Sequence, residues 1–214
     1  MPGNNSIKEG MKHLILCEGR DEWNFLTELS KAFNNQYSIV QIENFGGNDN
    51  LRLALKTWSI DPNFRNLKSL IVVRDAERDA NVAVDSIKSA FKNANLPVPP
   101  SPHQFETAEG GVKTGFVLFP KCSPELVNGT LEDLCLSILK EKNPPMSEID
   151  AFISDLKANN RKITRDFKTK LHTYFSITDK FVSLKIGEAA KAGAFDWSSS
   201  ELDQIKSFLG EMVS

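Results

Sequence analysis

Residues 70–79 read LIVVRDAERD, and this stretch decides how the chain folds. Its first four residues are apolar and mostly β-branched, which is typical of a strand buried on both faces of a sheet. Three acidic residues follow directly: Asp75, Glu77 and Asp79. Ligands of open parallel sheets gather at the carboxyl ends of the strands. The stretch therefore indicates an α/β protein with its chemistry at this strand end.

Three other short apolar runs, besides residues 68–73, have the composition of strands. They are residues 12–17 (KHLILC), 38–42 (SIVQI) and 114–119 (TGFVLF). In the intervening segments, apolar residues recur every three or four positions, which is typical of helices. The alternation predicts a parallel sheet of about four strands flanked by helices. The proline-rich segment 96–111 is predicted to be a long loop or short edge element near the site.

The last third of the chain has a helical pattern. A helix is predicted to begin at Thr130 and to end at residues 143–145 (NPP). We therefore divide the chain into an α/β domain, residues 1–142, and a helical extension, residues 143–214, that packs on it. Residues 157–191 contain nine Lys or Arg against three Asp or Glu. This basic extension suits a phosphate-bearing partner, although an ordinary solvated helix surface explains it equally well.

The composition is that of a globular protein, with 40% hydrophobic and 25% charged residues in 214. No apolar run approaches the ~20 residues that span a bilayer, and the N-terminus lacks the pattern of a signal peptide. The three cysteines have no CxxC spacing, which argues against a zinc site or a disulfide framework. We expect a cytoplasmic protein without a membrane partner.

Acidic residues also follow the first predicted strand. Glu18 closes that strand, Gly19 permits a tight turn, and Glu22 falls in the first turn of the next helix. If the first and third strands are neighbours, Glu18 and Glu22 meet the second acidic group. Alternate residues of an extended segment project the same way, so Asp75, Glu77 and Asp79 are expected to present their carboxylates together.

Carboxylates brought together repel one another unless a cation lies between them. Oxygen ligands of this kind favour Mg²⁺ or Mn²⁺ over zinc. The predicted ligands of this metal site are Glu18, Glu22, Asp75, Glu77 and Asp79. Helix ends offer another explanation for two of them, because Glu22 favours a helix N-terminus and Asp79 can cap the following helix.

The segments LILCEGRDE (residues 14–22) and LIVVRDAERD (residues 70–79) resemble the two acidic motifs of the Toprim domain. That domain occurs in topoisomerases, primases, OLD-type nucleases and recombination mediators. The wider sequence, including residues 45–51 and 129–133, resembles the uncharacterised Toprim-like proteins grouped as DUF3226. The resemblance covers residues 12 to about 139, and it implies a Toprim-like Rossmannoid fold.

The resemblance implies a role for each matching position. Glu18 would ligate a metal or act as general acid or base, and Asp75 with Glu77 would hold Mg²⁺; these three are the expected catalytic residues. Glu22 resembles the second acidic position of the OLD-type pattern, which supports two metals. Glu77 departs from the family, which usually has Asp at this position, and its side chain is longer by one methylene.

Phosphate-binding positions are predicted outside the acidic motifs. Gly46, Gly47 and Asn48 follow the second strand, where backbone N–H groups can bind a phosphate, although a plain turn explains them as well. Lys185 lies in the basic extension, where it either neutralises a phosphate or is simply solvated. Glu132 and Asp133 begin a helix, where acidic residues are favoured with or without a metal.

The leading hypothesis is Mg²⁺-dependent phosphodiester chemistry on DNA or RNA by a nuclease. A second hypothesis is a binding module that uses the same metal site without turnover. A third is hydrolysis of a small nucleotide, with the proline-rich segment as a lid. The sequence has no GxxxxGK[ST] motif and indicates neither haem nor a nucleotide cofactor. Neither Tyr37 nor Tyr174 lies in a recognisable topoisomerase context, which argues against strand transfer.

Overall fold

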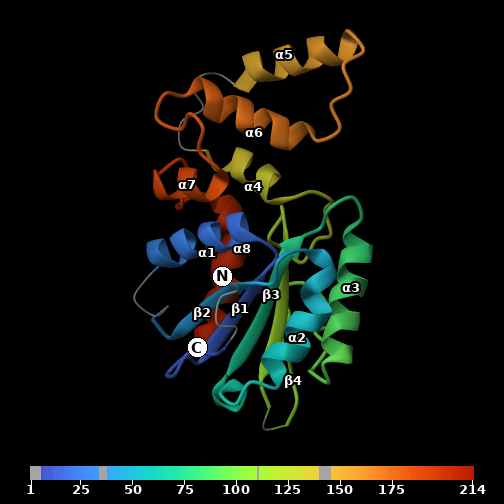
Figure 1. The fold of residues 1–214 in the computed structure, drawn as a ribbon, viewed down its shortest axis with the longest axis vertical. Coiled ribbons are helices and arrows are strands. Elements are labelled where there is room, and N and C mark those ends of the chain that lie inside the picture. The colour runs from blue at the N-terminus through green and yellow to red at the C-terminus, as the bar shows by residue number, and fades with distance from the viewer. Residues whose placement is uncertain (1–5, 34–37, 110, 140–145) are drawn as a thin grey trace.

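A computed structural model describes residues 6–33, 38–109, 111–139 and 146–214 (Figure 1). Its centre is a five-stranded sheet in the order β2-β1-β3-β5-β4. The strands are β1 (His13–Cys17), β2 (Val40–Asn44), β3 (Ser69–Asp75), β4 (Glu106–Thr107) and β5 (Lys113–Phe119). Only β4 runs antiparallel to its neighbour. The predicted α/β class and the four parallel strands are therefore confirmed, with ends that differ by at most two residues.

The sheet is covered on both faces because alternate residues of its strands point to opposite sides. Leu14 and Leu16 of β1 belong to the core under α2 (Leu51–Ser59) and α3 (Ala80–Asn93). Ile15 and Cys17 belong to a larger core on the other face. This core contains residues of α1 (Arg20–Phe33), α4 (Leu131–Ser137), α5 (Met146–Ala158), α6 (Asp166–Ile177), α7 (Ile186–Lys191) and α8 (Asp203–Val213).

The C-terminal helices share this core with the sheet. Helices α5 and α6 lie beyond the end of the sheet at which α4 begins, whereas α8 returns along the sheet (Figure 1). The ring of Phe208 stacks on Phe105 with 4.3 Å between centroids, and Lys113 Nζ donates to the carbonyl of Glu211. The expected boundary at residues 142/143 lies outside the described residues. The predicted helix from Thr130 to residues 143–145 was too long, because α4 ends at Ser137 and Leu139 already forms an antiparallel bridge with Phe195.

The predicted helix start at Thr130 is confirmed. Thr130 is the N-cap of α4, and its backbone N–H and hydroxyl both donate to Oδ2 of Asp133. This interaction satisfies one of the backbone donors that a helix start leaves without an intrahelical partner. Among the described helices, none has the length and apolar character needed to cross a membrane.

The proline-rich segment does not lie near the predicted site, and that expectation was wrong. Its short strand β4 pairs with the amino-terminal half of β5, where Thr114 Oγ1 donates to the carbonyl of Pro97. The acidic residues lie at the opposite, carboxyl end of the strands, next to Phe119. The described part of the segment therefore cannot cover them as a lid.

Candidate functional site

Four of the five predicted metal ligands line one cavity of about 630 Å³ at the carboxyl edge of the sheet; they are Glu18, Glu22, Asp75 and Glu77. Strands β1 and β3 are direct parallel neighbours, so the residues that follow them lie at the same edge of the sheet. The cavity wall includes the ends of both strands, the starts of α1 and α4, and the beginning of α6. Its charged residues are Glu18, Arg20, Asp21, Glu22, Asp75, Glu77, Arg78, Glu132, Asp133, Arg165, Asp166 and Lys168.

Glu18 and Glu22 lie on either side of the turn that leads from β1 into α1. The carbonyl oxygen of Glu18 accepts the backbone N–H groups of Gly46 and Gly47, each at 3.0 Å. Glu22 folds back over Gly19, where a Cβ would lie only 2.7 Å from Glu22 Oε2. A larger residue at position 19 would therefore displace the Glu22 carboxylate from its present position.

Asp75 is the last residue of β3, and only 9% of it is exposed. Its Oδ1 accepts the backbone N–H of Leu131, the first residue of α4, at 2.9 Å. Burial raises the pKa of Asp75 well above its ordinary value, and the charges of Glu22, Glu18 and Glu132 raise it further. Among the described residues, no Lys or Arg side chain lies within ion-pair distance of this carboxylate to offset the cost of burying its charge.

The expected extended arrangement of Asp75, Glu77 and Asp79 is wrong. The backbone turns at Glu77, whose φ is 57°, and the Glu77 N–H and C=O both bond to Gly129 at 2.8 Å. Glu77 is exposed but still lines the cavity. Asp79 instead caps α3, because its Oδ1 accepts the N–H groups of Asn81 and Val82. The residues that line the cavity do not include Asp79.

The pKa values of Glu22 and Glu18 are also raised. Burial, reinforced by the charges of Glu18, Asp21 and Glu132, raises the pKa of Glu22 to about 7. Burial also raises the pKa of Glu18, although the nearby Arg74 guanidinium opposes the shift. Arg74 Nε lies 4.0 Å from Glu18 Oε2, and neither buried atom has a hydrogen-bond partner among the described residues. The cavity thus holds excess negative charge that a cation would neutralise.

The donor set fits Mg²⁺ or Mn²⁺ in its chemistry, because hard carboxylate oxygens converge on one cavity. Glu18 Oε2 is buried and has no hydrogen-bond partner among the described residues, so it is an atom that such an ion would satisfy. Within the described residues, no three Asp, Glu, His or Cys side chains lie close enough to hold one ion. Mg²⁺ usually retains several water ligands, so one or two carboxylates suffice for binding.

The predicted phosphate-binding residues are arranged differently. The N–H groups of Gly46 and Gly47 already donate to Glu18, and of the two only Gly47 lines the cavity. Asn48 begins the short helix η2 (Asn48–Asn50). Lys185 is exposed and its backbone N–H donates to Glu188, but its side chain is not among those that line the cavity. Phosphate binding by these four residues stays a prediction.

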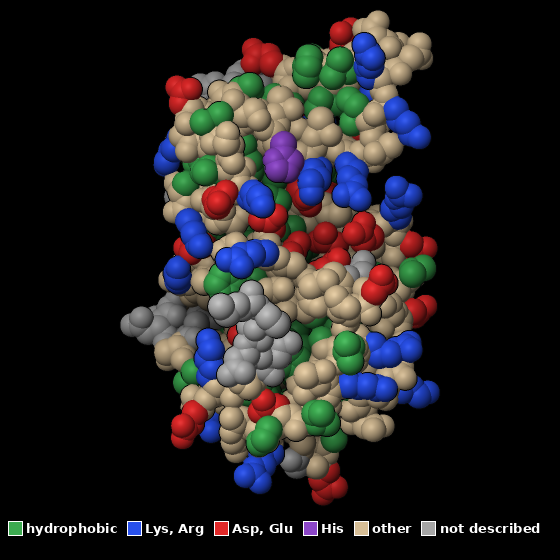
Figure 2. Space-filling model, in the orientation of Figure 1, with side chains coloured by type: hydrophobic (Ala, Val, Ile, Leu, Met, Phe, Trp, Pro, Cys, Tyr) green, Lys and Arg blue, Asp and Glu red, His purple; other side chains and the backbone are tan. Residues whose placement is uncertain are grey.

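Basic residues that the sequence did not single out surround the acidic cavity. Arg20, Arg78, Arg165 and Lys168 contribute to its wall. Lys168 Nζ forms an ion pair with Glu132 Oε1 at 3.2 Å and thereby joins α6 to α4. Figure 2 shows the acidic side chains in the hollow, with Lys and Arg side chains gathered beside it on the side of α6. The signal for Arg165 and Lys168 was the basic composition of residues 157–191.

Comparison with protein families matches one family model to residues 12–214. The chain belongs to the DUF3226 family. Its description is a protein of unknown function, so membership in DUF3226 assigns no activity to the acidic cavity. No curated protein and no solved structure shows a significant match to the chain.

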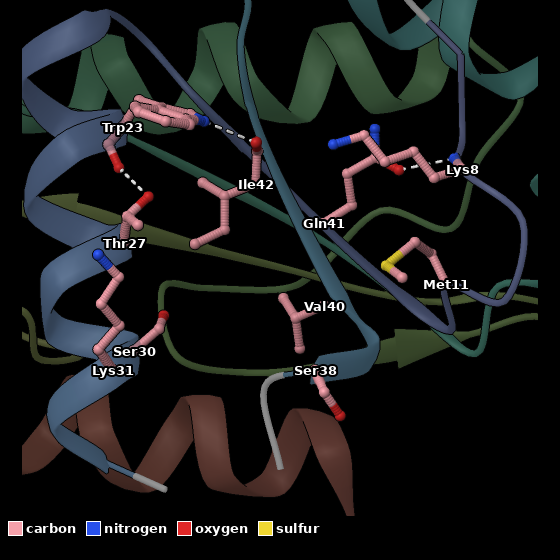
Figure 3. Close-up of a pocket in the computed structure, with 10 residues that line it drawn as sticks. All are labelled: Lys8, Met11, Trp23, Thr27, Ser30, Lys31, Ser38, Val40, Gln41 and Ile42. Atoms are coloured by element: carbon pink, nitrogen blue, oxygen red, sulfur yellow. Dashed lines mark hydrogen bonds between the residues drawn. The ribbon is translucent and has the colours of Figure 1, made fainter. Parts of the chain in front are cut away.

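A second cavity, of about 610 Å³, lies beside the edge strand β2 (Figure 3). The indole Nε1 of Trp23 donates to the carbonyl of Ile42 at 2.7 Å, and Lys8 N donates to Gln41 Oε1. Trp23 thus occupies a backbone acceptor on the open edge of the sheet, where an added strand would otherwise pair. The described lining of this second cavity contains none of the predicted site residues.

Proposed function

We propose that the acidic cavity binds Mg²⁺ or Mn²⁺ and that the protein hydrolyses phosphodiester bonds of nucleic acid, with a Toprim-like arrangement of its acidic residues. One observation carries the proposal. Carboxylates that follow two neighbouring parallel strands line a single cavity, and this cavity also has basic residues in its wall. Acidic groups of this kind suit a divalent cation, and basic groups beside them suit the phosphates of a substrate.

Glu18 and Asp75 are the proposed principal ligands, with Glu77 in support. Both principal carboxylates have a raised pKa in the absence of a cation, so binding one would remove an unfavourable charge interaction. A metal ion bound here would supply charge stabilisation and an activated water for phosphodiester hydrolysis. Arg74, which lies beside Glu18, would keep that carboxylate oriented toward the cavity.

Glu22 is the proposed proton carrier. Its pKa of about 7 lets it accept and return a proton near neutral pH, as efficient general acid–base catalysis requires. The side chain folds over Gly19, and Glu22 is among the residues that line the cavity. Arg165 and Arg78 would hold phosphate oxygens, because guanidinium groups bind phosphate with two parallel hydrogen bonds.

A second function, binding of nucleic acid without turnover, is favoured by one observation. Within the described residues, no three metal-ligating side chains converge on one point. A nuclease that uses two ions needs more ligands held in place than this arrangement offers without side-chain movement. Binding of one hydrated ion needs fewer protein ligands, because water supplies the others.

Cleavage of supercoiled plasmid and of a labelled oligonucleotide in Mn²⁺ or Mg²⁺ tests the proposal. The wild type is expected to cleave, and Glu18→Gln/Asp75→Asn to cleave at least about 100-fold more slowly. The matched control is Glu9→Gln/Asp85→Asn, which makes the same chemical changes at exposed positions and should cleave like the wild type. If wild type and variant are equally inert while both bind DNA, the nuclease function is rejected in favour of binding. A nucleotide that raises the melting temperature of a protein unable to bind DNA would instead favour nucleotide hydrolysis.

A further inference from the structure

Helix α6 borders another cavity, of about 610 Å³, which we call the α6 groove. Its lining residues are Lys162, Ile163, Thr164, Arg165, Lys168, Thr169, His172, Thr173 and Ser176. Three of these are Lys or Arg and one is His, and the described lining contains no acidic residue. Thr164, Arg165 and Lys168 also line the acidic cavity, so the two hollows adjoin.

The Arg, Lys and His side chains of the α6 groove follow one another along α6, beginning at its N-cap Arg165. Arg165, Lys168 and His172 are three and four residues apart, which corresponds to roughly 4.5 and 6 Å along the helix axis. Lys168 is paired with Glu132. Within the described residues, no carboxylate lies within ion-pair distance of Lys162 or Arg165. These two side chains are thus the ones available for an anionic partner.

An aromatic ring lies in the wall of the acidic cavity, next in sequence to Lys168, which lines both cavities. Phe167 is 51% exposed although it lines that cavity. Its ring lies 6.0 Å from Lys170 Nζ. An exposed aromatic ring next to a cationic groove is the combination with which proteins bind unpaired nucleic acid, because bases stack on the ring while the backbone follows the positive charge.

We propose that the α6 groove binds the sugar-phosphate backbone of a single-stranded nucleic acid, that a base stacks on Phe167, and that the strand continues into the acidic cavity. This inference rests on the proposed function, because it names the substrate of the same cavity. A duplex cannot offer an unpaired base to Phe167 without losing base stacking and pairing. The preference for single strands follows from this requirement.

Binding of a 5′-fluorescein-labelled 20-nucleotide single strand, measured by fluorescence anisotropy in EDTA, tests the inference without any cleavage. Phe167→Ala is expected to weaken binding on the order of tenfold. Phe167→Leu, which keeps an apolar side chain but no ring, should show a similar loss. The control is Phe152→Ala, because Phe152 is 55% exposed on α5 and lines neither cavity. It should bind like the wild type.

The contribution of contacts with the sugar-phosphate backbone is tested by the dependence of binding affinity on salt concentration. Lys162→Gln/Arg165→Gln removes two cations, so the slope of log K against log salt should become shallower by about 1.4, since each phosphate contact of a single strand contributes about 0.7. Lys88→Gln/Lys92→Gln on α3 removes the same charge away from the groove and should leave the slope unchanged. Unchanged melting temperatures show that the variants are folded.

The outcomes separate the inference from the proposed function. If Phe167→Ala binds like Phe152→Ala, or if duplex of the same sequence binds as tightly as the single strand, the inference is overturned even where the wild type cleaves nucleic acid. If the groove variants lose binding but the wild type cleaves nothing in Mn²⁺, the nuclease function fails and the single-strand site stands.

Discussion

The backbone N–H of Leu131 donates a hydrogen bond of 2.9 Å to Oδ1 of Asp75. These residues are 56 positions apart, and the bond joins the end of β3 to the start of α4. It gives a nine-tenths buried carboxylate a backbone donor, and it orients the side chain that we propose as a metal ligand. The position of α4 and the geometry of the acidic cavity are therefore coupled.

Two replacements of Asp75 should separate the contribution of its hydrogen bond to stability from the contribution of its charge. Asn keeps an acceptor for Leu131, whereas Ala leaves that buried N–H without one. We expect Asp75→Ala to have a free energy of unfolding about 1–3 kcal/mol lower than Asp75→Asn. Urea denaturation at pH 7 in EDTA measures the difference. Equal stabilities would mean that water or another group satisfies the N–H of Leu131.

The stability of the metal-free protein should depend on pH through Glu22. Its folded-state pKa of about 7 lies above the ordinary value of 4.5, so the folded state retains a proton that the unfolded state releases. The contribution of Glu22 is present below pH 4.5 and is lost as pH rises to about 7. The effect of Glu22→Gln on the free energy of unfolding should therefore be more stabilising at pH 8 than at pH 4.5, by roughly 2–3 kcal/mol. The exposed Glu9→Gln should show no such change in urea denaturation, and a pH-independent effect of Glu22→Gln contradicts the prediction.

Metal binding should compete with protons in the acidic cavity. Mn²⁺ competes with protons for the proposed ligands Glu18 and Asp75, whose pKa values are raised. Loss of the Glu22 proton near pH 7 adds negative charge beside them, so the affinity for Mn²⁺ should increase with pH between about 6 and 8. At 100 times its dissociation constant, the ion would stabilise the protein by about 2.7 kcal/mol. Melting temperatures with and without Mn²⁺, recorded between pH 6 and pH 8, measure this stabilisation and its dependence on pH.

The same shift should vanish in Glu18→Gln/Asp75→Asn and persist in Glu9→Gln/Asp85→Asn. A shift of equal size in both double variants would show that Mn²⁺ binds outside the acidic cavity. A shift that does not grow with pH would show that the titrating carboxylates are not its ligands.

Close packing of α7 on α1 should make position 187 sensitive to substitution. A Cβ on Gly187 would lie 2.4 Å from the Cβ of Asn24, and the Gly187 N–H donates to Asp21 Oδ1. Gly187→Ala should lower the free energy of unfolding by about 1–3 kcal/mol. The control is Gly210→Ala in α8, where a Cβ meets nothing within 4 Å and helix propensity favours Ala by up to about 1 kcal/mol. In chemical denaturation, the two variants should change the free energy of unfolding in opposite directions. Two losses of equal size would contradict the packing argument.

The sequence by itself determined the architecture and the centre of the candidate site. Short apolar runs that alternate with helical periodicity favour a parallel sheet, because such strands must be buried on both faces. Parallel strands end at the same edge, so Glu18 and Asp75 could be brought together from their positions after two strands. The helix start at Thr130 was also predicted, since it depends on neighbouring residues of the chain.

The tertiary structure alone decided the details that depend on turns and on distant packing. The turn at Glu77 follows from its pairing with Gly129, 52 positions later, and no local pattern indicates it. It directs Asp79 to the cap of α3 and away from the cavity. Phe167 and Arg165 reach the acidic edge because α6 packs against α4. Periodicity reports which face of an element is buried, whereas packing between elements decides which side chains share a cavity.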